Sequence, residues 1–94
     1  MRRKPRGKFE IIRDILDYVD RDEHPSVGVA MYATGISYRT FKKYLRMLVE
    51  RGFLEVYEGR ICVWGKPRTK LLRLTSKGRR LLRMLREEGL EVEF

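Results

Sequence analysis

The chain has 94 residues, of which 22 are Lys or Arg and 13 are Asp or Glu, so its formal net charge is +9 at pH 7. Its single cysteine, Cys62, excludes an intrachain disulfide, and no apolar run approaches the roughly 18 residues of a membrane span. The lone histidine, His24, has no Cys or His partner at metal-ligand spacing. The composition therefore predicts one intracellular domain, not an enzyme and without metal or cofactor, whose partner is a polyanion.

Charge is segregated along the chain. Residues 1–8 carry five cations, residues 9–58 carry seven cations and nine acids (net −2), and residues 59–94 carry ten cations and four acids (net +6). Within the middle block, residues 36–49 contain four cations and no acid. This segregation favours nucleic acid as the partner over a generally basic surface. Asn and Gln are absent and 37% of residues are charged, a bias typical of thermophile proteins.

The first seven residues predict a flexible basic arm, because they surround Pro5 and Gly7 with cations and offer little to bury. This arm either follows a minor groove or makes no specific contact. Its cations are Arg2, Arg3, Lys4 and Arg6. A helix over 8–22 follows, since apolar residues repeat there at helical spacing, with acids on the far side. Ser26 is expected to cap a second helix through Thr34, which Gly35 ends.

A third helix is predicted over 37–51, with Ser37 as its cap and Gly52 at its end. At about 100° per residue, one arc of this helix is apolar and the opposite arc is cationic. The arc expected to fill the core contains Phe41, Tyr44, Leu45, Leu48 and Val49. The opposite arc contains Arg39, Lys42, Lys43 and Arg46.

After Gly52 the apolar spacing shortens to about two, which predicts strands over 53–57, 61–64 and 71–74. A turn near Gly59 would give a short hairpin and a third strand, whereas a turn at 65–67 would give one long hairpin, which we favour. Trp64 lies near this second turn, where packing on its own sheet is favoured over stacking on sugar or bridging two subunits. Cys62 is expected to be a buried or edge thiol. A last helix is predicted over 77–88, followed by a tail over 90–94.

Helix, helix, tight turn, helix, hairpin and helix is the order of a winged helix-turn-helix domain. The stretch MYATGISYRTFKKYLRMLVERGFLEV at 31–56, followed by LTSKGRRLL at 74–82, resembles the archaeal ArnR-like winged helix-turn-helix regulators and the small chromatin proteins related to them. The resemblance covers about residues 9–88. It implies an α+β, mainly α fold, in which a three-helix core, a β-hairpin wing and a C-terminal helix form one domain over 8–89.

The resemblance also implies that the third helix enters the major groove of double-stranded DNA and that the wing contacts the backbone or the minor groove. Arg39 then suits a bidentate contact to guanine, whereas the other cations of the helix divide between base edges and phosphates. The helix start would meet a phosphate, although the ring of Tyr38 borders the apolar arc and could simply pack. The residues at this start are Ser37, Tyr38 and Thr40; the wing cations are Arg60, Lys66, Arg68 and Lys70.

The last helix bears two sets of side chains that raise further expectations. Its arginines either form a solvated face or extend the phosphate-binding surface; they are Arg79, Arg80, Arg83 and Arg86. A homodimer is expected because two-fold related readers match palindromic sites. The apolar residues of this helix, with Leu90 and Phe94 beyond it, support the dimer because they offer more surface than this core needs; the alternative is that the helix over 8–22 contributes the interface. The apolar residues of the helix are Leu81, Leu82, Met84 and Leu85.

A sequence-specific transcriptional regulator in the cytoplasm, associated with the nucleoid, is the leading functional hypothesis. An architectural protein that binds DNA with little base preference is the alternative. A third hypothesis is an adaptor whose acidic first helix docks on a basic protein. No small-molecule ligand is evident in the residue pattern.

Overall fold

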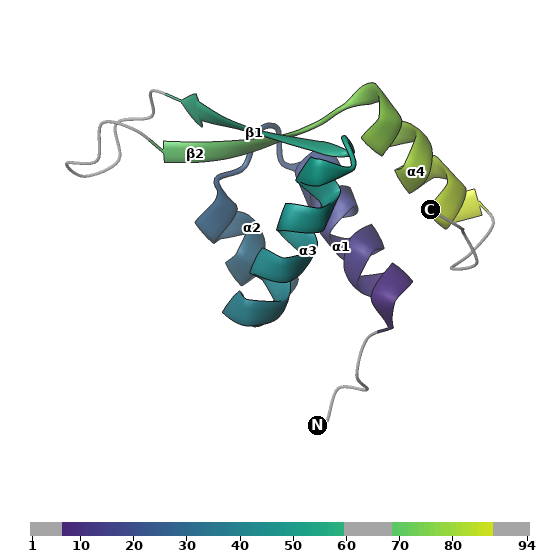
Figure 1. Cartoon of the computed structure of the whole chain (residues 1–94), viewed down its shortest axis with the longest axis horizontal. Coiled ribbons are helices and arrows are strands. Elements are labelled where there is room, and N and C mark those ends of the chain that lie inside the picture. The colour runs from purple at the N-terminus through teal and green to yellow at the C-terminus, as the bar shows by residue number, and fades with distance from the viewer. Residues whose placement is uncertain (1–6, 60–68, 88–94) are drawn as a thin grey trace.

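The computed structural model describes residues 7–59 and 69–87 of the chain. Its elements are α1 (Lys8–Arg21), α2 (Val27–Thr34), α3 (Tyr38–Glu50), β1 (Leu54–Gly59), β2 (Thr69–Leu74) and α4 (Ser76–Glu87). In Figure 1 the first three helices lie below the hairpin of β1 and β2, and α4 lies at one end beside α1. The predicted three-helix core, hairpin and C-terminal helix are therefore confirmed. Within the described ranges, no helix has the length and apolar character needed to cross a membrane.

The ends of α2 and α3 follow the predicted capping residues, with one exception. Ser26 Oγ accepts a hydrogen bond from the Val29 amide at 3.1 Å, and Gly35 ends α2 in the left-handed conformation. Gly52 has φ of 80° directly after α3. Ser37 occupies the N-cap position of α3, but its side chain accepts no capping hydrogen bond, so that expected contact is wrong. The first amides of α3 consequently lack a side-chain cap.

The hairpin is antiparallel, and its register runs from Leu54 opposite Leu74 to Gly59 opposite Thr69. Because Gly59 is paired with a residue ten positions later, the alternative with a turn at Gly59 is wrong, and β1 and β2 form one hairpin as we favoured. The expected turn at 65–67, together with Cys62 and Trp64, lies outside the described residues. The Leu72 amide also donates to the Pro25 carbonyl at 2.8 Å, which ties β2 to the start of α2.

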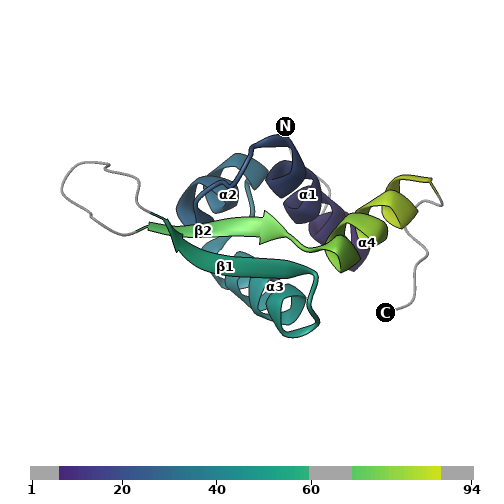
Figure 2. The same ribbon diagram turned by 90° about the horizontal axis from the view of Figure 1, so that it is seen from above.

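The core lies where α1 meets the other helices and the sheet (Figure 2). Its fully buried large side chains come from five of the six elements. They are Ile12, Ile15, Leu16, Phe41, Leu48, Leu54, Leu72, Leu82 and Leu85. Burial of this kind contributes about 1.5 to 3 kcal/mol per large side chain before the entropy of ordering the chain is subtracted.

Two expectations about apolar surface are wrong. Leu81, Leu82 and Leu85 are at most 4% exposed because they cover α1, so α4 has no surplus apolar face. Of its four apolar residues, only Met84 is exposed, at 42%. Leu90 and Phe94, which belong to the same expectation, lie outside the described residues. Val49 of α3 is 36% exposed and lies outside the core cluster. Helical spacing shows which apolar residues share one face of a helix, but whether each of them is buried depends on how the neighbouring elements pack against that face.

The end of α3 is joined to the start of α4 by several short contacts. Thr75 Oγ1 donates to the Gly52 carbonyl at 2.5 Å and accepts from the Gly78 amide at 3.0 Å, so it also caps α4. Lys77 Nζ donates to the Arg51 carbonyl at 2.8 Å. A Cβ atom on Gly78 would lie 2.0 Å from the Phe53 carbonyl oxygen. This joint fixes where α3 ends relative to α4.

Candidate nucleic-acid interface

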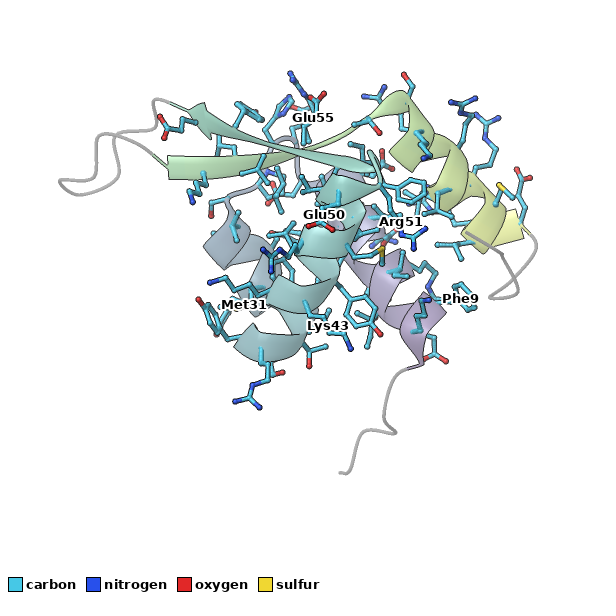
Figure 3. All side chains as sticks on the ribbon, viewed as in Figure 1. Phe9, Met31, Lys43, Glu50, Arg51 and Glu55 are labelled. Atoms are coloured by element: carbon cyan, nitrogen blue, oxygen red, sulfur yellow. The ribbon has the colours of Figure 1, made fainter. Side chains whose placement is uncertain are left out.

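The outward side of α3 carries cations, and its inward side is buried. Phe41 and Leu48 pack into the core, whereas the four cations predicted to face a partner are all exposed: Arg39, Lys42, Lys43 and Arg46. Figure 3 shows Lys43 and Glu50 on the exposed side of this helix. The structure thus brings together the cations that the sequence placed on one arc, and it holds them on a rigid element.

An open groove of about 980 Å³ lies between α3 and β1. The four cations of α3 line it together with Tyr38 and Glu50. Three apolar side chains also line it, namely Leu45, Val49 and Val56, the last of which is 39% exposed. The groove therefore combines positive charge with partly exposed aliphatic surface. Such a lining suits an anionic chain that also has apolar parts, as the sugar-phosphate backbone does.

The hydroxyl of Tyr38 accepts a hydrogen bond from Lys42 Nζ at 3.1 Å, and the same ammonium lies 5.3 Å from the centre of the Tyr38 ring. Tyr38 is 64% exposed, so the alternative in which its ring packs into the core is wrong. Ser37 is exposed as well, and Thr40 is half-buried. These contacts hold the Lys42 ammonium beside the helix start.

One carboxylate lies on the same side of α3. Glu50 Oε1 is 3.4 Å from Arg46 Nε, and both side chains are largely exposed. Such a pair is weak in water, so the Arg46 guanidinium stays available to a stronger anion.

The hairpin contributes one described cation from the predicted wing set. Lys70 is exposed on β2 and lies directly across from Glu58 of β1. Arg73 of the same strand is engaged, because its Nη2 atom lies 2.6 Å from Glu55 Oε2. The other predicted wing residues, Arg60, Lys66 and Arg68, and the arm residues Arg2, Arg3, Lys4 and Arg6 lie outside the described residues.

Tyr32 is an exposed aromatic residue that the sequence analysis did not single out. Its side chain is 88% exposed on α2. Ala30 and Thr34 are the buried residues of α2, and a residue two positions from each points to the opposite side of a helix. That spacing is the signal that could have identified Tyr32.

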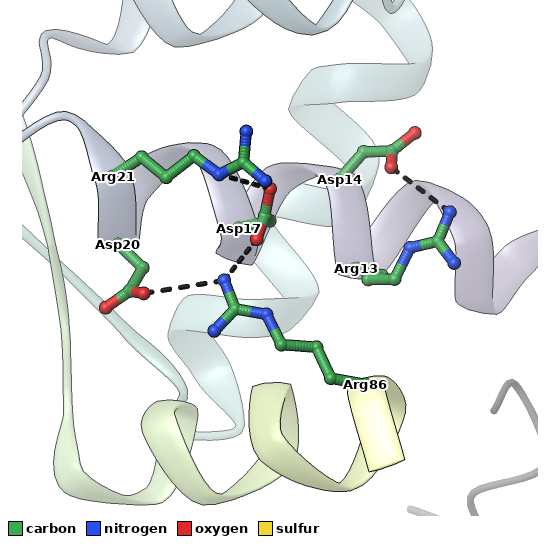
Figure 4. A network of polar contacts seen from close by, with 6 residues as sticks. All are labelled: Arg13, Asp14, Asp17, Asp20, Arg21 and Arg86. Carbon is green, nitrogen blue, oxygen red and sulfur yellow. Dashed lines mark hydrogen bonds and ion pairs between the residues drawn. The ribbon is translucent and has the colours of Figure 1, made fainter. Parts of the chain in front are cut away.

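The acidic outer face of α1 is engaged within the chain (Figure 4). Arg86 of α4 donates to Asp17 and lies 3.5 Å from Asp20, and the hydrogen bond to Asp17 raises the pKa of the Arg86 guanidinium. Arg21 lies 3.0 Å from Asp17. The hydroxyl of Tyr18 donates to Asp22 at 2.7 Å, which raises the pKa of that phenol. All three acids thus bind neighbouring side chains, and Asp17 and Asp20 link α1 to α4.

No group of three or more His, Cys, Asp or Glu side chains that could hold a metal ion occurs within 7–59 and 69–87. His24 adopts φ of 54° in the turn after α1, and its ring meets that of Tyr57 edge-on at 5.7 Å.

Over 54 residues the chain is 35% identical to an uncharacterized protein of Methanocaldococcus jannaschii. The match covers 57% of this chain and 55% of that protein, so the chain spans little more than half the length of this curated relative.

Solved structures share the fold. Sso10a-2, a DNA-binding protein from Sulfolobus solfataricus, is 31% identical with a TM-score of 0.68, and the match covers 88% of this chain and 78% of that one. The PcaV transcriptional regulator from Streptomyces coelicolor is 24% identical with a TM-score of 0.66, over 80% of this chain and 52% of that one, which is a likeness of fold alone. A family model described as winged helix-turn-helix matches residues 5–91. The chain therefore belongs to the winged helix-turn-helix family, as its motifs suggested.

Proposed function

We propose that the chain is a DNA-binding transcriptional regulator that holds double-stranded DNA between α3 and the hairpin. One observation carries this proposal: the four exposed cations of α3 line a groove beside β1, while the other side of the helix is locked in the core. A rigid helix of this kind can enter a major groove, because the groove of B-DNA is wide enough for a helix. The likeness to Sso10a-2, which is described as a DNA-binding protein, supports the proposal.

The proposed contacts follow from position along α3. Arg39 lies in the first turn, where it suits a bidentate contact to guanine, and Lys42, Lys43 and Arg46 divide between base edges and phosphates. The first amides of α3 lack a side-chain cap, which leaves them available to a phosphate beside Tyr38. Contacts from Lys70, the remaining wing cations and the arm belong to the same proposal.

A homodimer is part of the proposal, because two α3 helices related by a two-fold axis would match a palindromic site. Because the leucines of α4 are buried in their own chain, the apolar surface of α4 does not add support to this expectation. A location in the cytoplasm, with the nucleoid, follows from the DNA partner. The relative in Methanocaldococcus jannaschii supports an archaeal setting. The proposal of a thermophilic setting rests on the composition, in which Asn and Gln are absent and 37% of residues are charged. Sedimentation of the chain with and without duplex measures the assembly state.

Titration of a random duplex at several salt concentrations tests DNA binding. About six phosphate contacts predict a log-log slope near −5, and a slope near zero would contradict the proposal. Replacing Lys42, Lys43 and Arg46 by Ala should make the slope shallower by about 2 to 3. The matched control replaces Arg13, Arg21 and Arg73, three cations that already pair with acids, and should leave the slope unchanged.

A second measurement separates a regulator from an architectural protein. Selection of bound sites from a random pool, followed by competition with random DNA, should give a preference of roughly 10³ or more. Arg39→Ala should relax that preference at one position and cost about 1 to 3 kcal/mol, whereas Lys70→Ala should weaken all sequences alike. Equal behaviour of the two variants would show that α3 and the wing do not divide base and phosphate contacts.

A further inference from the structure

The outer face of α4 carries a second group of cations, Arg79, Arg80 and Arg83. All three are exposed, and none forms an ion pair with another described residue. They lie within about one turn of each other, so their like charges repel. Two of them lie near the start of α4, whose first turn contains no acid, although the positive end of a helix disfavours cations. An external anion would relieve both unfavourable effects.

Arg86 shows that an arginine of α4 can form ion pairs with carboxylates of the same chain. Arg86 comes from the same helix and reaches Asp17 and Asp20 of α1. Glu87 lies one turn after Arg83, but the two side chains form no ion pair. The three outer arginines are therefore left without a carboxylate on an element that has carboxylates nearby.

A concavity of about 450 Å³ lies beside these arginines. Arg79 and Arg83 line it together with Arg86 and with the buried side chain of Leu82. A guanidinium presents a planar fork of donors that matches a phosphate group. Because Asp20 and Glu87 also line the concavity, a compact free anion fits less well than an extended polyanion that spans all three outer arginines.

The α4 cations and the α3 cations line separate concavities. Arg79 and Arg83 share theirs with Asp20 of α1, whereas the α3 cations line the groove beside β1. In Figure 1, α4 lies at one end of the molecule, where it packs on α1 and β2. Because the two sets of cations line different concavities, a duplex in the groove beside β1 leaves the α4 concavity unoccupied.

We propose that Arg79, Arg80 and Arg83 form a second phosphate-binding surface that holds a second DNA duplex, so that one chain bridges two duplexes. The first duplex occupies α3, so this inference rests on the proposed function. Bridging then needs no second protein chain, because the two surfaces belong to one domain.

A sandwich assay with the full chain tests this proposal. One duplex is fixed to beads and saturated with protein, the excess is washed away, and a fluorescent duplex of random sequence is added. The parent chain should capture the second duplex. Replacing Arg79, Arg80 and Arg83 by Ala should lower capture at least tenfold, while affinity for a single duplex at limiting DNA changes less than threefold. Triple replacement by Lys should retain most of the capture, since the charge remains.

Two controls make the result specific. The variant with Ala at Arg13, Arg21 and Arg73 has the same net charge as the α4 variant and should capture like the parent. Circular dichroism and the melting temperature check folding, which Ala at exposed helix positions should preserve.

Capture by the α4 triple-Ala variant at the parent level would overturn the proposal, because bridging would then come from paired chains. A parent that binds one duplex tightly but captures no second duplex would overturn it as well, and α4 would be a solvated face. The proposed function fails separately if single-duplex binding depends on the α4 arginines and survives the loss of Lys42, Lys43 and Arg46.

Discussion

The helices α1 and α3 share an amphipathic pattern but use their outer charges differently. On α1, Asp17 binds Arg21 and Arg86, and Asp22 binds Tyr18. On α3, four cations share a single carboxylate, Glu50. The outer charge of α1 therefore holds the domain together, whereas that of α3 remains available to a partner. Whether a charged helix face has a function outside the chain depends on its internal partners more than on its total charge.

The largest expected effect tests whether the free cations of α3 depend on the packing beneath them. Phe41 is 1% exposed below the cationic face, so Phe41→Ala should lower the free energy of unfolding by about 3 to 5 kcal/mol. Urea denaturation measures the loss. Phe41→Leu is the control and should retain much of the stability. If Phe41→Ala were as stable as the parent, α3 would not depend on this side chain.

A smaller effect tests the internal use of charge on α1. Arg86→Ala leaves Asp17 and Asp20 without their partner from α4 and should cost about 1 kcal/mol, because the network is partly exposed to water. A double-mutant cycle with Asp17→Ala measures the coupling by urea denaturation. Arg83→Ala on the same helix is the control and should leave stability nearly unchanged. Equal losses for the two arginines would contradict the contrast between paired and unpaired cations.

The smallest effect concerns the one acid on the cationic face of α3. Glu50→Gln removes the competitor of Arg46 and the repulsion of phosphates, so affinity for random duplex should rise about two- to fivefold, the range of a weak exposed ion pair. Glu55→Gln is the control, since Arg73 already neutralises Glu55 on the hairpin. Anisotropy at constant salt measures both. Unchanged affinity for Glu50→Gln would place the DNA away from the end of α3.

The order and bounds of the helices could be predicted because their signals are local. Ser26, Gly35 and Gly52 act on the backbone within a few residues of themselves, and helical spacing identifies the buried arc of α1. The spacing of apolar residues also located β1 and β2. The sequence does not locate the hairpin turn, because two glycine-containing segments both have turn chemistry.

Where the predicted burial or partner of a residue was wrong or missing, the outcome depends on contacts between segments that are far apart in the sequence. Val49 lies at the edge of an apolar arc. It is partly exposed because β1 does not cover it; Val49 and Val56 of β1 line the same groove. The burial of Leu81 and Leu85 could not be predicted from the sequence, because it depends on the position of α1, which they cover. The bond between Arg86 and Asp17 joins residues 69 positions apart, for which no local pattern exists. The cationic arc of α3 was predictable because it lies within a single helix.

The joint between α3 and α4 predicts how the chain tolerates change at two glycines. At Gly52 the obstacle is the positive φ, which Asn can adopt at moderate cost. At Gly78 the obstacle is space, because any Cβ atom would collide with a backbone oxygen that cannot rotate away. In a saturation library selected for folding, Asn should therefore survive at position 52, while position 78 should accept glycine alone.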